Sequence, residues 1–112
     1  MGENHIQQSI QQKSFEFALS VIRLYKKLQA RQEFILSPQL LKSGTRIGMS
    51  VEEAIAHADL GQRTAHMAVA SKHARETHYW LKLLQESKLV DVDVSHELAQ
   101  IEELLHLLSH IS

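Results

Sequence analysis

The sequence predicts an all-α protein, an antiparallel up-down-up-down four-helix bundle. Apolar residues recur every three or four positions in four successive stretches, and the connections between these stretches are short. One proline and four glycines among 112 residues leave little material for the turns of a β fold. We therefore expect more than about 70% helix, with helices near residues 14–31, 38–58, 62–87 and 95–111.

The first helix follows a polar, glutamine-rich segment without a clear period. We expect this segment, residues 1–13, to be a flexible N-terminal arm in front of a bundle domain over residues 14–112. The helix itself is predicted by one apolar stripe with charged residues opposite it. Its members are Phe17, Ala18, Val21, Leu24, Tyr25 and Leu28.

The second helix begins at Ser37 and Pro38, a serine that can act as N-cap followed by a proline in the first turn. Its apolar face is thin because Gly44 and Gly48 lie on it. Each glycine inside a helix costs about 1 kcal/mol relative to alanine, so we expect another backbone to approach closely there. The helix ends near residues 58–62, where Asp59 can cap the next one and Gly61 can end this one.

The third helix carries more apolar surface than one core requires. One edge holds Met67, Ala70, Ala74, Leu81 and Leu84, and another holds Ala65, Val69, Trp80 and Leu83. Two stripes indicate neighbours on both sides, either within the bundle or across a subunit interface. The fourth helix, capped by Asp93 or Ser95, has one stripe. That stripe consists of Leu98, Ile101, Leu104, Leu105, Leu108 and Ile111.

Composition excludes several classes of protein. The chain has no cysteine, which removes disulfides, thiolate catalysis and cysteine-ligated zinc. No apolar run approaches the roughly 20 residues of a membrane span, and the N-terminus lacks an apolar signal core, so we expect a cytoplasmic protein. No nucleophile elbow, phosphate-binding loop or zinc-protease motif is present, so we expect no enzymatic activity.

Metal binding is an alternative because the chain has eight histidines. A di-iron bundle needs Glu-x-x-His motifs on two helices, and only Glu103 and His106 have that spacing, on the side opposite the apolar stripe. Two further pairs one turn apart, Glu53 with His57 and His106 with His110, resemble pairs that are common on solvated helix faces. We therefore expect that neither folding nor function requires a metal or a cofactor.

Two other histidines, His66 and His73, lie within the wide apolar arc of the third helix. A histidine in such a place needs a hydrogen-bond partner, and either Glu76, one turn beyond His73, or a residue of another subunit can supply it. We expect core or interface histidines here, with metal ligation as the alternative.

Three runs of sequence resemble a known family. They are KSFEFALSVIRLYKKLQ from Lys13, LSPQLLKSGTRIGMSVEEA from Leu36 and ARETHYWLKLL from Ala74. In this order they closely resemble the bacterial four-helix bundle family, also called the 23S ribosomal RNA intervening-sequence protein family, over Lys13 to about Ile111. The resemblance implies a left-handed bundle without enzymatic activity that assembles as a homopentamer. It also implies a possible role like that of the related retroelement accessory protein, which binds a reverse transcriptase and nucleic acid through a basic surface.

These expectations point to two sets of residues. For a self-association interface the candidates are Glu53, Val69, His73, Arg75, Glu76, Trp80 and Leu83. For nucleic acid the candidates form two basic strips, one with Arg23, Lys26, Lys27 and Arg31 and one with Lys72, Arg75 and Lys82. No aromatic stacking platform lies beside the first strip, and the sequence pI of about 6.7 is not that of a basic protein. We therefore expect an oligomeric scaffold first and an RNA- or DNA-binding accessory protein second.

Overall fold

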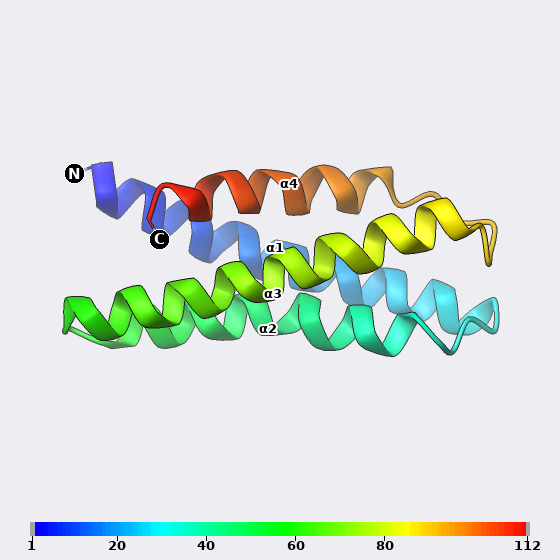
Figure 1. Cartoon of the computed structure of the whole chain (residues 1–112), viewed down its shortest axis with the longest axis horizontal. Helices are drawn as coiled ribbons and strands as arrows, with labels where there is room; N and C mark the ends of the chain where they lie inside the picture. The colour runs from blue at the N-terminus through cyan, green and yellow to red at the C-terminus, as the bar shows by residue number, and fades with distance from the viewer. Residues whose placement is uncertain (1, 112) are drawn as a thin grey trace.

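The chain folds into an elongated four-helix bundle. The computed structural model describes residues 2–111, and these form the helices α1 (Gly2–Ala30), α2 (Ser37–Ala56), α3 (Leu60–Ser87) and α4 (Ser95–Ser109). The helices alternate in direction, and both ends of the chain lie at the same end of a rod with extents of 44 × 19 × 18 Å (Figure 1). The all-α, up-down-up-down prediction is therefore confirmed, and 83% of the chain is helical.

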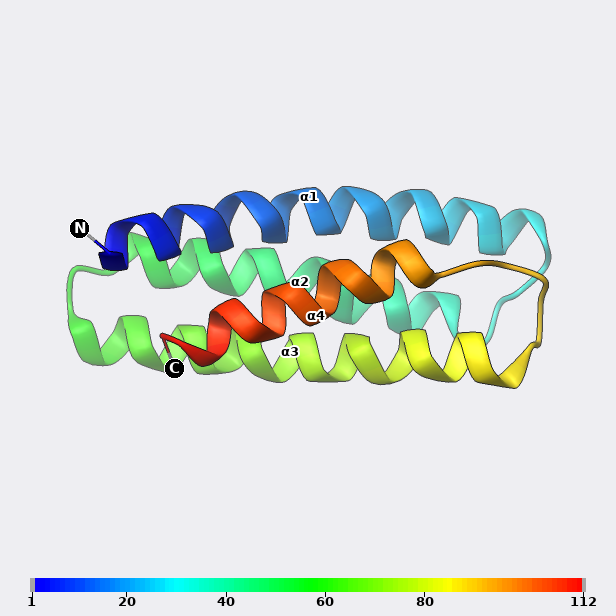
Figure 2. The ribbon, with the colours of Figure 1, turned by 90° about the horizontal axis from the view of Figure 1, so that it is seen from above.

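Each helix contacts the two that precede and follow it around the bundle. α1 packs on α2 and α4, and α3 packs on α2 and α4, so within residues 2–111 the pairs α1/α3 and α2/α4 are diagonal. Figure 2 shows α1 and α3 at opposite edges, with α2 and α4 between them. The bundle thus has four sides, each formed by two neighbouring helices.

Buried positions alternate at intervals of three and four residues, the spacing of left-handed helix packing. In α3 the buried series is Met67, Ala70, Ala74, Thr77, Leu81 and Leu84, and in α1 it is Ile10, Ser14, Phe17, Val21, Leu24 and Leu28. One continuous apolar core results, which runs the length of the rod. Among the described residues no helix is both long and apolar enough to cross a membrane.

The start of the first helix was predicted wrongly. α1 begins at Gly2 rather than near residue 14, so residues 2–13 are helical and not a loose arm. The physical reason is burial, because Ile10 is fully enclosed in the core and Ile6 packs against it. Glutamine is also a good helix former, so this polar segment continues the helix. Met1 of the predicted arm and Ser112 of the predicted domain lie outside the described residues.

The other helix boundaries agree within two residues, but three details of the termini differ. The N-cap position of α4 is held by Val94, while Asp93 accepts from the backbone nitrogen of Ser95. Gly61 lies in the first turn of α3 and does not end α2.

Ser37 is the first residue of α2 and not its N-cap, and the N-cap position is held by Leu36 without a side-chain bond. The carboxylate of Glu33 caps this helix instead, by accepting hydrogen bonds from the backbone. Asp59 caps α3 as predicted, because its side chain accepts from the backbone nitrogen of Gln62 at 2.9 Å.

The close approach predicted at the thin face of α2 is confirmed. A Cβ atom built on Gly44 would lie 2.9 Å from a methyl group of Val21, closer than real side chains come. One built on Gly48 would lie 3.5 Å from the carbonyl oxygen of Ser14, an ordinary contact. α1 therefore packs most tightly on α2 at Gly44, where only glycine fits without a shift.

Candidate functional site

The side formed by α2 and α3 brings together three of the predicted interface residues, His73, Glu76 and Trp80, which line one groove. Val69 is 41% exposed, while Trp80 and Leu83 are half-buried and pack against the core. His73 lies 2.9 Å from Glu76 through its Nδ1, so the partner predicted for this histidine is confirmed. We call this surface the α2/α3 face.

A groove of about 200 Å³ runs along the α2/α3 face. A buried hydrogen bond of 2.8 Å from the Thr77 hydroxyl to Ser43 joins the two helices beneath it. Its lining residues are Gln39, Lys42, Ser43, Arg46, Lys72, His73, Glu76 and Trp80. Lys72, predicted to act with Arg75 and Lys82, therefore shares this groove with Lys42 and Arg46 of α2, which the predicted strip did not include.

The side formed by α1 and α2 carries an apolar surface that the sequence reasoning missed. Its exposed members are Phe15 (65%), Leu19 (38%), Ile22 (42%) and Met49 (66%). Phe15 and Met49 flank a groove of about 360 Å³, whose lining includes Gly48. A hydrogen bond of 3.0 Å from the Gln11 amide to Glu52 connects the same two helices there. We call this surface the α1/α2 face.

The signal for the α1/α2 face was present in the sequence. Phe15, Leu19 and Ile22 recur at intervals of four and three residues, on the side of the helix that faces away from its core stripe. α1 therefore has a second apolar stripe. From the sequence, such a second stripe was recognised only on α3.

The two predicted basic strips do not join. Arg23, Lys26, Lys27 and Arg31 are exposed on α1, and Lys72, Arg75 and Lys82 are exposed on α3, which is the diagonal helix. Beside the α3 strip stands an aromatic residue, Tyr79, which is exposed and makes an edge-to-face contact with Trp80 at 5.2 Å. Arg75 and these two aromatic residues line one shallow depression with Glu76.

The acidic C-terminal helix lies against basic residues of its neighbours. Glu103 forms an ion pair of 3.3 Å with Lys13, and Glu102 lies 3.4 Å from the Nε2 of His78. Glu103 and His106 are both exposed, so their predicted direction away from the core is confirmed. The di-iron alternative therefore finds no inward-facing motif in the described helices.

Three other potential ligands meet where α2 turns into α3. Glu53, His57 and His66 each offer one ligand atom, and these atoms lie within 4.8 Å of one another. The rings of His57 and His66 stack in parallel, with centroids 5.0 Å apart and an interplanar angle of 4°. The sequence reasoning treated the Glu53–His57 pair and His66 separately, because only the turn between the helices brings them together.

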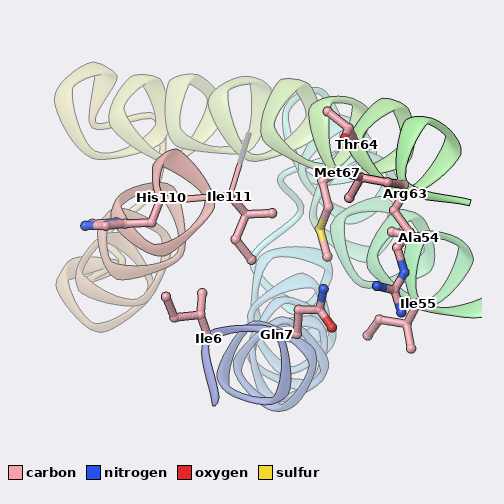
Figure 3. Close-up of a pocket in the computed structure, with 10 residues that line it drawn as sticks. Ile6, Gln7, Ala54, Ile55, Arg63, Thr64, Met67, His110 and Ile111 are labelled. Atoms are coloured by element: carbon pink, nitrogen blue, oxygen red, sulfur yellow. The ribbon is translucent and has the colours of Figure 1, made fainter. Parts of the chain in front are cut away.

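A small pocket of about 110 Å³ lies at the end of the rod where the two chain ends meet. Ile6 and Gln7 of α1, Met67 of α3 and Ile111 after α4 point into it from three directions (Figure 3). Most of its lining residues are apolar. Arg63, which also lines it, donates its Nε proton to the backbone carbonyl of His57 at 2.8 Å. No acid and base pair suited to catalysis stands among its lining residues.

These features define a compact helical bundle with exposed grooves between its helices rather than a deep active site. Residues 7–110 match the family described as 23S rRNA-intervening sequence protein, and the chain belongs to that family. A crystal structure from Bacteroides thetaiotaomicron, described as a protein of unknown function from the S23 ribosomal protein family, is similar with 32% identity and a TM-score of 0.88. The similarity covers 95% of this chain and 96% of that one. None of the curated proteins compared with the chain matches it.

Proposed function

We propose that this chain is a non-enzymatic scaffold and interaction protein that assembles into a homo-oligomer. The observation that carries the proposal is the presence of two exposed faces on adjacent sides of one bundle. The α1/α2 face exposes Phe15 and Met49, and α3 carries the exposed Val69 and, about three turns further along, the half-buried Trp80. Exposed large apolar side chains of this kind mark sites of association.

Two different faces favour a head-to-tail contact, in which one face of a subunit binds the other face of the next. The two faces lie on adjacent sides of the bundle and not on opposite sides. Each subunit is therefore rotated relative to the one before it, and repeated contacts of this kind favour a closed ring over a fibre. The family resemblance suggests five subunits. Glu53 of α2 and Arg75 and Glu76 of α3 are exposed charged residues that can pair at the rim of the contact, where such pairs set register more than affinity.

The mass of the purified full chain, measured by light scattering and native mass spectrometry, tests the proposal. We expect a pentamer for the parent, and smaller species for Phe15→Glu and Met49→Glu on one face and for Val69→Glu on the other. Leu89→Glu is the matched control, because Leu89 is equally exposed but lies in the loop between α3 and α4.

A monomeric parent at micromolar concentration would contradict the assembly, and a dimer or tetramer would contradict only the number. If Phe15→Glu assembles like Leu89→Glu, the α1/α2 face is not part of the contact.

We propose direct binding of RNA or DNA, as an accessory protein acting with a reverse transcriptase, as the second candidate function. Lys42, Arg46 and Lys72 line the groove of the α2/α3 face, and Tyr79 is exposed next to the neighbouring Arg75. Cations bind phosphates and an exposed aromatic ring can stack on a base. A ring would repeat this weak site several times and raise its effective affinity.

Titration of generic RNA and DNA at increasing salt concentration tests this second function. We expect the logarithm of the binding constant to fall linearly with the logarithm of the salt concentration. The slope should be smaller for Lys72→Glu than for the parent. The same titration of Lys26→Glu, a variant of the basic strip on the diagonal helix α1, shows which of the two basic strips binds the nucleic acid. No binding at low salt by the assembled parent would contradict the proposal.

A further inference from the structure

We propose that Glu53, His57 and His66 bind a divalent transition-metal ion, with zinc as the best match. The site lies at the corner where α2 turns into α3, and it uses one carboxylate oxygen and two imidazole nitrogens. The inference concerns the single chain and does not depend on the proposed assembly.

The distances among the three side chains are close to those of a metal site. Bonds of 2.0–2.2 Å place the ligand atoms of a tetrahedral zinc ion about 3.4 Å apart. The observed ligand atoms already lie within 4.8 Å of one another. Glu53 is exposed and both histidines are half-exposed, so rotation of their side chains can close the remaining gap of up to about 1.4 Å without disturbing the core.

The backbone that carries the ligands is held on both sides of the turn. His57 is the C-cap of α2, its N–H donates to the carbonyl of Ala54, and its own carbonyl accepts from Arg63 of α3 at 2.8 Å. Asp59 fixes the first turn of α3 by its cap to Gln62. The three-residue connection therefore positions His57 and His66 before any ion binds, which reduces the entropic cost of binding.

The surroundings of the two rings also suit ligation. The rings stack on each other with centroids 5.0 Å apart. Among the described residues, neither the carboxylate of Glu53 nor either ring makes a hydrogen bond or an ion pair. The lone pairs of all three groups are therefore available to an ion.

The donor set selects the class of metal. Two nitrogens and one oxygen suit zinc, and also cobalt, nickel or copper, while calcium and magnesium prefer oxygen ligands alone. Three protein ligands leave the fourth position to water or to another ligand. His106 and His110, whose rings are 4.8 Å apart on α4, belong to no such group of three in residues 2–111.

Calorimetric titration of the chelator-treated full chain with zinc chloride tests the proposal. We expect one zinc ion per chain. Glu53→Gln or His66→Ala should lower the affinity for zinc roughly 100-fold, because each variant removes one of the three ligands. The matched control is the double variant His106→Ala with His110→Ala, which removes two histidines one turn apart and should bind zinc like the parent. Far-UV circular dichroism verifies that each variant is folded.

A second variant tests the same position without removing a ligand. His66→Cys keeps a donor, so cobalt bound to this variant should show a thiolate-to-metal charge-transfer band that the parent lacks. Zinc binding that is unchanged in His66→Ala, or that is lost in the His106/His110 double variant, would overturn the proposal. The absence of the new cobalt band would overturn it as well.

Discussion

The carboxylate of Glu33 lies 2.7 Å from the backbone nitrogen of Ser37, the first residue of α2. It also accepts from the backbone nitrogens of Ile35 and Leu36, and the hydroxyl of Ser37 donates to the Glu33 carbonyl at 2.7 Å. The first N–H groups of a helix have no partner within it, and a negative charge there is favoured by the helix dipole. Glu33 therefore acts as the cap of α2 although it precedes the helix by four residues.

Replacing this cap should destabilise the protein. Glu33 is only 4% exposed, so Glu33→Ala leaves buried donors without an acceptor, and we expect unfolding free energy to fall by about 2–3 kcal/mol. Glu33→Gln keeps one acceptor oxygen and should cost about half as much. Urea denaturation at neutral pH measures both. Glu86→Ala, at an exposed glutamate of α3, is the control and should change stability by less than about 0.5 kcal/mol.

Much of the fold could be predicted from sequence because the buried residues repeat every three or four positions in each helix. The start of α1 could not, because Ile6 and Ile10 are isolated among glutamines and become core residues only when α4 packs beside them. The role of Glu33 was missed for a similar reason. Its hydrogen bonds to the start of α2 depend on how the chain turns after Arg31.

The candidate sites were harder to predict because their residues come from different elements. His73, Glu76 and Trp80 do line one groove, but Lys42 and Arg46 join Lys72 there only through the packing of α2 on α3. His57 and His66 are nine positions apart and meet only across a turn. Periodicity within one helix contains no information about either grouping.

The two glycines of α2 should respond in opposite directions to the same substitution. Gly44→Ala places a methyl group 2.9 Å from Val21, which is fully buried, so overpacking should outweigh the better helix propensity. We expect a net loss of about 1–2 kcal/mol. Gly48→Ala meets only ordinary contacts and should gain up to about 1 kcal/mol. Thermal denaturation of both variants gives the comparison, and equal effects would show that Val21 moves aside freely.

The start of α4 should contribute a stability that depends on pH. The backbone N–H of Ser95 donates to Asp93 at 3.0 Å and holds the pKa of that carboxyl below its usual range, helped by the Ser95 side chain and by the charge of Lys27. A carboxyl whose pKa is lower in the folded state than in the unfolded state stabilises the fold at pH values above its unfolded pKa of about 3.9. This stabilisation is lost as the pH falls through the pKa of the folded state.

The variant Asp93→Ala should therefore be less stable than the parent at neutral pH, and the difference should shrink as the pH falls below about 4. Urea denaturation across this pH range measures it. Asp91→Ala, in the same loop, is the control and should follow the parent throughout. A difference that stays constant down to pH 2 would mean that the charge of Asp93 has no part in the cap.

Trp80 should matter both within the subunit and between subunits. It is half-buried, packs against the core and lines the groove of the α2/α3 face. Complete burial would make Trp80→Ala cost about 3–5 kcal/mol, so for a half-buried ring we expect about 2 kcal/mol even in the dissociated chain. Tyr79→Ala is the matched control, because Tyr79 touches the same ring but is 58% exposed, and it should cost less than about 1 kcal/mol.

The fluorescence of Trp80 separates the two contributions, because it is the only tryptophan of the chain. If the α2/α3 face is covered by a second copy, dilution should shift the emission to longer wavelength before any loss of helix is seen by circular dichroism, since water then reaches the exposed half of the ring. If the emission changes only together with unfolding, Trp80 contributes to the core of its own subunit and not to a contact between subunits. In that case the contact between subunits must use the α1/α2 face without it.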